Sequence, residues 1–261
     1  MEFEGRVVWL TGGGGRIGRV IAALFAREGA AVGVCDLDLA GAERAAADVQ
    51  AVGGRAIALS GDVSKEVDVD RMLADLTKTL GPVDILVNSH GVSPNVPVVD
   101  MDLDTWQAPF VVNTQGCFLT CRAAARQMVA RGARGCIINL SSGAARSGRP
   151  GSAAYCASKA AINMLSEVLA TELGPLGIRV NVVTPGLVTS EPLRRGEATH
   201  PYLNMMIEMT PMGRTGVPTD VAEAVLALAS HRLPWVTGAN LEVTGGSHCG
   251  RTNAPLTMRL R

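Results

Sequence analysis

The chain has 261 residues, enough for one large domain with a sizeable core, and its 24 basic side chains balance 24 acidic ones. Apolar residues make up 47% of the sequence but aromatic residues only 3%, so Ala, Val, Leu and Ile must form that core. The absence of a basic cluster, of a membrane-length apolar run and of a leader-like start argues against nucleic-acid binding, membrane insertion and export. We therefore expect a soluble, cytoplasmic protein.

The six cysteines lie mostly in apolar strand or helix contexts and include no Cys-x-x-Cys pair. Such cysteines are typical of reduced, buried small hydrophobes, so neither a disulfide framework nor a metal site is expected. Cys156 lies beside Tyr155, but no histidine is close in sequence to activate its thiol.

A strand, a glycine turn and a helix open the chain. Residues 6–10 are a short β-rich apolar run, and residues 20–26 have helical spacing. Between them, Thr11 to Gly18 contains a Gly-x-Gly-x-x-Gly spacing that begins at Gly13. Glycines in this context allow a tight turn and the close approach of a diphosphate, whose charge rests on the amides of the helix. We predict a dinucleotide site here; a plain flexible loop is the alternative.

The second strand, residues 31–35, ends in Asp36. A carboxylate at this point can accept hydrogen bonds from the ribose hydroxyls of an adenosine and repels a 2′-phosphate. We therefore expect NAD(H) in preference to NADP(H), with a turn or capping role as the alternative for Asp36.

Strands and helices then alternate without a break. The further predicted strands are 56–60, 83–87, 136–140, 178–183 and 240–243, and the predicted helices are 42–52, 67–80, two within 102–130, one running past Tyr155 to residue 169, and 218–230. This order predicts a single α/β domain with a doubly wound parallel sheet of seven strands and a site at their carboxyl ends. Asp62 and Asn88 fall at two of these ends, where they could meet the adenine and the ribose or cap the next helix.

The strongest chemical signal lies between residues 139 and 159. Tyr155 and Lys159 are four apart in an Ala-rich helical run, so they stand on one face of a helix. The phenol of a free tyrosine has a pKa of about 10, and a nearby cation favours its ionised form. Ser142 follows the predicted strand and could face the phenol. Alternatively, Tyr155 is an ordinary helix residue, Lys159 a solvated charge and Ser142 a turn residue.

The stretch from 187 to 212 loses strand character and is expected to form a lid over the substrate. It holds Tyr202 and the flexible thioethers of Met205, Met206, Met209 and Met212, which suit an adaptable apolar surface, although methionines at helical spacing are often core. Arginines could instead bind a carboxylate or phosphate, but arginines in loops are mostly solvated; the candidates are Arg146, Arg149, Arg194 and Arg195. We expect a fairly apolar, medium-sized secondary alcohol or ketone, and an irregular tail over about 247–261.

With these residues in view, the sequence resembles the short-chain dehydrogenase/reductase family in its short, single-domain form. The resemblance runs from Arg6 to about Gly246. It rests on motifs in the family's order, namely Thr11-Gly12 to Gly18, Asp62-Val63, Asn88 to Gly91, Asn113, Ser142, Tyr155-x-x-x-Lys159, Pro185-Gly186, and a Thr-Gly-x-x-x-x-Val-x-Gly-Gly run from Thr237 to Gly246.

The resemblance implies an NAD-dependent oxidoreductase that interconverts a secondary alcohol and a ketone. It makes Tyr155 the general acid or base, Lys159 its supporting cation and ribose ligand, Ser142 the group that positions the reacting oxygen, and Asn113 part of a proton relay. The implied cofactor contacts are Gly12, Gly15, Arg16, Ile17, Gly18, Asp36, Asp62, Val63, Asn88, Gly91, Tyr155, Lys159, Pro185, Gly186, Val188 and Ser190. Members often assemble through the long helices that flank the serine strand, so a homotetramer or a homodimer is expected.

The sequence departs from the family's pattern at several positions. Arg16 replaces a usual glycine and is similar to the pteridine-reductase branch, which leaves an NADPH-dependent pteridine-type reductase as one alternative. That branch tends to lose the catalytic serine, whereas this chain keeps Ser142 as well as Asp36. Further replacements are Ser89, His90, Ser190 and Thr244.

A second alternative is a nucleotide-binding protein that keeps the fold without catalysis. The complete set of Asn113, Ser142, Tyr155 and Lys159 argues against it, because the fold does not require these side chains.

Overall fold

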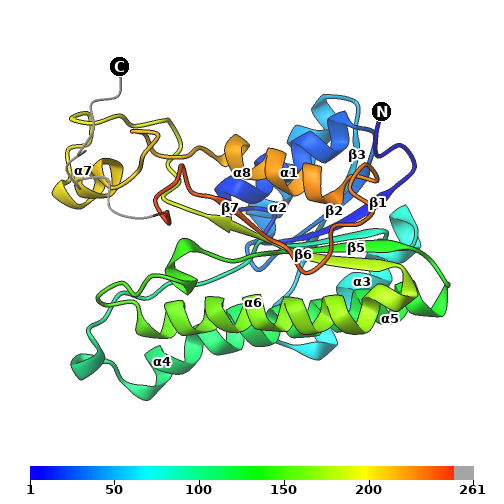
Figure 1. Cartoon of the computed structure of the whole chain (residues 1–261). Coiled ribbons are helices and arrows are strands. Elements are labelled where there is room, and N and C mark those ends of the chain that lie inside the picture. The colour runs from blue at the N-terminus through cyan, green and yellow to red at the C-terminus, as the bar shows by residue number, and fades with distance from the viewer. Residues whose placement is uncertain (250–261) are drawn as a thin grey trace.

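The computed structural model in Figure 1 describes residues 1–249. Its centre is a parallel sheet in the order β3-β2-β1-β4-β5-β6-β7. The strands are β1 (Val7–Thr11), β2 (Ala31–Asp36), β3 (Arg55–Ser60), β4 (Ile85–Asn88), β5 (Gly135–Leu140), β6 (Ile178–Pro185) and β7 (Asn240–Val243). The predicted doubly wound parallel sheet of seven strands is therefore confirmed, and its order reverses between β1 and β4.

Helices cover both faces of this sheet (Figure 1). One face carries α1 (Arg16–Arg27), α2 (Leu39–Ala51) and α8 (Pro218–Ala229), and the other carries α3 (Glu66–Leu80), α5 (Gly116–Ala130) and α6 (Ala153–Leu173). Strand β1 shows why both faces are buried. Val8 and Leu10 pack into the cluster under α1 and α8, whereas Trp9 packs into the cluster under α3 and α5. Alternating apolar side chains thus serve two cores.

The two helices predicted within residues 102–130 form one nearly continuous element. The helix α4 (Leu103–Pro109) passes into a π-helical turn, η2 (Phe110–Gln115), which leads directly into α5. Hydrophobic spacing alone does not distinguish this wide turn from two separate helices. Such turns re-aim side chains and often lie at functional sites, and this one contains Asn113.

Loops gather beyond the carboxyl ends of the strands, together with the short helix α7 (Pro201–Glu208) (Figure 1). The predicted lid range includes α7, and its flanking chain is held by isolated bridges from Val188 to Gly216 and from Arg194 to Arg214. None of the helices within residues 1–249 has the length and apolar character to cross a membrane. Most of the predicted tail lies outside the described residues, which end at Cys249.

Candidate active site

The glycine turn after β1 is closely packed. Gly12 has a φ of +64°, and a Cβ atom there would lie 2.5 Å from the backbone nitrogen of His90. A Cβ at Gly18 would lie 2.4 Å from the carbonyl oxygen of Gly12. Both neighbours are backbone atoms that cannot move aside cheaply, so the turn requires glycine at these two positions.

The amino end of α1 is open to an anion. Its N-cap, Gly15, supplies no side-chain cap, and the first turn contains no acidic residue. Gly15 and Arg16 are exposed, so free backbone amides and a guanidinium lie at the same end of the helix. Together with the compact glycine turn, this arrangement fits the diphosphate of a dinucleotide.

Asp36 ends β2 beside this turn. One carboxylate oxygen accepts a hydrogen bond from the backbone N–H of Gly14 at 2.9 Å, and the other accepts from the N–H of Asp38 at 3.1 Å. Asp36 therefore stabilises the turns on either side of it, which is the alternative role that the sequence left open. The same contacts fix a half-buried carboxylate next to the glycine turn, where an adenosine ribose would lie in a dinucleotide fold.

The polar side chains at the ends of β3 and β4 are largely occupied within the protein. Asp62 accepts from both the N–H and the hydroxyl of Ser64, at 2.9 and 2.6 Å, just before α3. The Asn88 amide donates to the Asn139 side chain at 2.9 Å and accepts from Thr11 at 3.0 Å. Asp62 thus bonds to the turn that precedes α3, whose N-cap Lys65 has no side-chain cap, and the Asn88 side chain is bonded within the protein. The predicted contacts of both residues with the cofactor stay predictions.

Asn113 is fully buried in the π-helical turn. Its side-chain oxygen accepts from the N–H of Val92 at 2.8 Å, and its amide nitrogen donates to the Val92 carbonyl at 3.0 Å and to the Ser158 hydroxyl at 3.0 Å. Asn113 therefore joins the loop after β4 to helix α6. The expected structural hydrogen bonds are present. One of them holds Asn113 against Ser158, the residue that precedes Lys159 in the chain.

Ser142, Tyr155 and Lys159 come from adjoining elements. Ser142 follows β5, and its hydroxyl accepts from the N–H of Ala144 at 3.2 Å. Tyr155 lies in the first turn of α6, half-buried, and its hydroxyl has no hydrogen-bond partner within residues 1–249. The Lys159 Nζ lies 6.0 Å from the centre of the Tyr155 ring. A phenol with a free hydroxyl thus stands beside a cation.

Lys159 is 4% exposed, and its Nζ donates to the carbonyl of Leu140, the last residue of β5, at 2.8 Å. A Cβ atom on Gly91 would lie 3.5 Å from this Nζ and 3.2 Å from the Asn113 oxygen. The ammonium is therefore enclosed by the ends of β4 and β5. Burial lowers the pKa of Lys159 to about 8.

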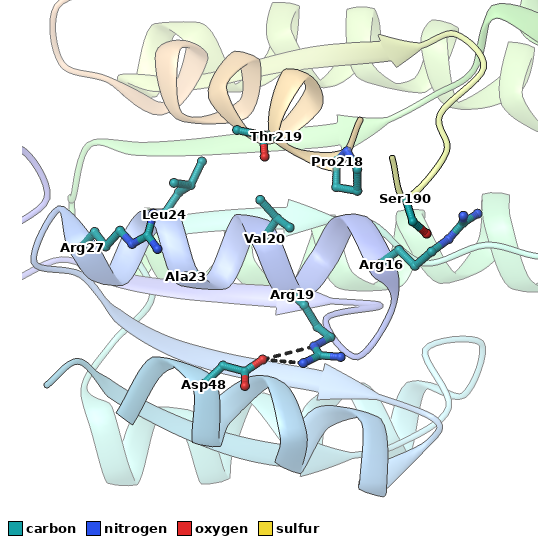
Figure 2. Close-up of a pocket in the computed structure, with 10 residues that line it drawn as sticks. All are labelled: Arg16, Arg19, Val20, Ala23, Leu24, Arg27, Asp48, Ser190, Pro218 and Thr219. Atoms are coloured by element: carbon teal, nitrogen blue, oxygen red, sulfur yellow. Dashed lines mark hydrogen bonds and ion pairs between the residues drawn. The ribbon is translucent and has the colours of Figure 1, made fainter. Parts of the chain in front are cut away.

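The residues after β6 complete the rim. A Cβ on Gly186 would lie 2.9 Å from the Cα of Thr244, so these two chain segments pass closely. Ser190 lines an open pocket of about 490 Å³ between α1 and α8, which Arg16 also lines (Figure 2). The pocket connects two predicted cofactor residues from distant parts of the sequence. Its other walls come from α1 and the start of α8, together with Asp48 of α2.

The sequence does not predict the contacts that several neighbours of the site make. The His90 ring lies 2.7 Å from the Thr11 hydroxyl, and burial, followed by the charge of Lys159, lowers the pKa of His90 to about 3. His90 is thus a neutral interior group, directed towards Thr11. Ser158 and Arg149 also reach the site by contacts between segments, which spacing along one segment does not reveal.

The sheet order and the glycine turn define a Rossmann-like dinucleotide fold. A family model described as enoyl-(acyl carrier protein) reductase matches residues 15–248. The 2-(S)-hydroxypropyl-CoM dehydrogenase 3 of Xanthobacter autotrophicus is 39% identical over 249 residues, covering 94% of this chain and 97% of that protein. The (3R)-3-hydroxyacyl-CoA dehydrogenase of Canis lupus familiaris is 38% identical, with coverages of 94% and 97%.

Among solved structures, a short-chain type dehydrogenase/reductase from Mycobacterium marinum superposes with a TM-score of 0.88 at 32% identity, covering 95% of this chain and 97% of that one. The chain belongs to the short-chain dehydrogenase/reductase family, and it is an oxidoreductase of that family. Dehydrogenases of the family use a nicotinamide cofactor, either NAD or NADP. The open end of α1 and the carboxylate of Asp36 fit such a dinucleotide.

Proposed function

We propose that the protein is an NAD(H)-dependent dehydrogenase that interconverts a secondary alcohol and a ketone. The observation that carries the proposal is the half-buried Tyr155, whose hydroxyl has no partner within residues 1–249 and whose ring lies 6.0 Å from the Lys159 ammonium. A phenol held in this way is available to exchange a proton with a bound oxygen. The names of the relatives, both dehydrogenases of hydroxy compounds, support the same class of donor.

The chain's own residues supply binding and proton transfer. When bound, the nicotinamide carries the hydride. In the reducing direction, Tyr155 gives its proton to the carbonyl oxygen while the Ser142 hydroxyl donates a hydrogen bond to the same atom. The Lys159 ammonium stabilises the phenolate that remains and holds a ribose hydroxyl.

Asn113 has a supporting role in this proposal. Its bonds to Val92 and Ser158 hold the π-helical turn against α6, one turn of which carries Tyr155 and Lys159. The proton that restores Tyr155 after each turnover would travel past Lys159 on the side where Asn113 lies. The proposed contacts of Val63, Pro185 and Val188 to the cofactor follow from the family's motifs.

The preference for NAD over NADP rests on Asp36. Asp36→Asn keeps an acceptor for the Gly14 N–H but removes the charge that repels a 2′-phosphate. We expect the native protein to bind NADH more tightly than NADPH, and the variant to lose at least about tenfold of that preference, because like charges in contact cost several kcal/mol. Equal native affinity for both cofactors would contradict the NAD assignment and favour the pteridine-type alternative that Arg16 suggests.

A substrate panel tests the activity itself. Secondary and cyclic alcohols are mixed with NAD⁺, and the matching ketones with NADH, while NADH absorbance is followed. Turnover of at least one pair is expected, and Ser142→Ala should lower kcat by about a hundredfold or more without changing NADH affinity. Tight NADH binding without turnover of any pair would favour the catalytically silent alternative.

The lid and the assembly are further parts of the proposal. The range 187–212 would cover a medium-sized, partly apolar substrate, for which half-exposed Met205 and Met209 offer adaptable contacts. On one face of the sheet, α5 and α6 expose apolar side chains around a pocket of about 430 Å³ that Phe118 and Val129 line. Such a surface supports a homotetramer or homodimer built on these helices.

A further inference from the structure

Arg149 lies beside the proposed catalytic tyrosine. It belongs to the loop that joins the Ser142 turn to α6, and its guanidinium carbon is 5.8 Å from the centre of the Tyr155 ring. The Lys159 ammonium approaches the same ring to 6.0 Å. Two cations therefore lie near the Tyr155 ring, of which Lys159 is buried and Arg149 only half-buried.

The position of this guanidinium is fixed by the loop. The Arg149 Nε donates to the hydroxyl of Ser152 at 3.1 Å, and the Arg149 carbonyl accepts from the Ser152 N–H at 3.1 Å. Ser152 is fully buried and precedes the first residue of α6. Because Nε is the bonded atom, both terminal nitrogens of Arg149 keep their donors free of any partner within residues 1–249.

Two other arginines, Arg146 in the same loop and Arg214 before α8, have carboxylate partners. Arg146 forms an ion pair with Glu242 at 3.2 Å, and Arg214 forms one with Asp220 at 2.7 Å. Within the described residues no carboxylate lies at ion-pair distance from Arg149. A half-buried guanidinium that rests on an aromatic ring without a counter-charge presents its planar pair of donors to a ligand, and such a pair matches a carboxylate, sulfonate or phosphate.

We propose that the substrate carries an anionic group which Arg149 binds, close to the carbon that is oxidised or reduced. The inference rests on the proposed function, because it uses Tyr155 as the point where the reacting oxygen lies. The Arg149 guanidinium lies close to the ring of Tyr155, which is the proposed proton donor. The anionic group and the reacting carbon would therefore belong to the same small molecule and be separated by a few bonds. The methionines of the lid then meet the uncharged part of the substrate, so a fairly apolar substrate that also carries one anionic group satisfies both surfaces.

The test compares matched ligands that differ only in charge. The probes are 4-oxopentanoate and its methyl ester, a 2-oxoalkyl sulfonate, a 2-oxoalkyl phosphate monoester, and an uncharged methyl ketone of the same length. Binding of each probe is measured by calorimetry to the NADH complex of Tyr155→Phe, where no turnover interferes, and turnover is measured with the native protein. The three acids distinguish the kind of anion, and the ester and ketone report the uncharged baseline.

Arg149→Met and Arg149→Lys are introduced into both backgrounds, and Arg146→Met is the control, because it removes the same charge from the same loop at an ion-paired position. At least one acid should bind more tightly than its neutral partner, by about tenfold to a hundredfold, as expected for charge-assisted hydrogen bonds. Arg149→Met should abolish this preference, Arg149→Lys should retain part of it, and Arg146→Met should leave it unchanged. NADH affinity and the unfolding midpoint of each variant show whether the fold is intact.

The two proposals fail in different ways. Binding of the acids and the neutral probes with equal affinity, or a preference that survives Arg149→Met, overturns the role of Arg149 even if ketones are reduced. An Arg149-dependent preference in the absence of any turnover supports the anion site and contradicts the proposed function alone.

Discussion

The buried ammonium of Lys159 lowers the stability of the fold. Its ammonium is buried at the ends of β4 and β5 with one carbonyl partner at 2.8 Å, and burial lowers its pKa from 10.5 to about 8. The unfolded chain therefore binds this proton more tightly than the folded chain does. That difference corresponds to roughly 3 kcal/mol of lost stability at neutral pH.

Lys159→Met should accordingly stabilise the protein while it removes activity. At pH 7 we expect the free energy of unfolding to rise by roughly 2 kcal/mol, because the relieved burial cost exceeds the lost hydrogen bond to Leu140. The advantage of the variant should be largest below pH 8 and should vanish as pH rises from about 8 towards 10.5, where the lysine of the native chain loses its proton in both states. Denaturant unfolding of both proteins across this range measures it; a less stable variant at pH 7 would refute the assignment.

Residues differ in how far the sequence reveals them. Tyr155 and Lys159 can be predicted because one helical turn relates them, and Asp36 because it ends a strand after a glycine turn. For Arg149 the sequence leaves two interpretations open, namely a contact with a carboxylate or phosphate and the solvated position that is usual for loop arginines. Its contact with Tyr155 depends on how a loop folds back, and local periodicity carries no information about such a contact.

Among the elements, the turn from β1 into α1 has the tightest requirement for glycine. Gly18→Ala would place a methyl group 2.4 Å from the Gly12 carbonyl oxygen, whereas Gly174→Ala, in the chain after α6, would meet no atom within 4 Å. We expect Gly18→Ala to cost about 1–3 kcal/mol and to weaken NADH binding, because the turn must open. Gly174→Ala should stay within about 0.5 kcal/mol of the native protein.

Thermal unfolding and NADH fluorescence titration measure both glycine variants. Native-like stability and cofactor affinity in Gly18→Ala would show that the turn adapts to a side chain, and the close packing would then not be required for the dinucleotide.

The elements themselves are largely predictable from the sequence. Each predicted strand is present, because buried parallel strands are short apolar runs that end at turn residues. The π-helical turn around Asn113 is the exception. A π-helical turn is a feature of the backbone hydrogen bonds, and the sequence carries no separate signal for it. The contacts of Asn113 with Val92 and Ser158 likewise join segments that are distant in sequence.

For the whole molecule, the exposed apolar surface of α5 and α6 predicts self-association. Phe118 is 42% exposed and Val168 44% exposed on these neighbouring helices. We expect light scattering to give the mass of a tetramer or dimer, and Phe118→Asp combined with Val168→Asp to give monomers, because two desolvated carboxylates oppose burial of the surface.

Val67→Asp is the matched control for this experiment. Val67 is 73% exposed on α3, outside the proposed interface, so the variant should keep the native mass. A native protein that is monomeric at all concentrations tested would contradict the proposed assembly.

For the whole molecule, we propose that the fold brings Tyr155 as proton donor, Lys159 as its supporting cation and the glycine turn that binds the dinucleotide to one edge of the sheet. The most direct measurement is the turnover of Tyr155→Phe, with any ketone that the native protein reduces, together with its NADH dissociation constant. We predict that kcat falls by at least about a hundredfold, because the proton donor is lost, while the NADH dissociation constant changes by less than about twofold. Turnover at the native rate would contradict the proposed role of Tyr155.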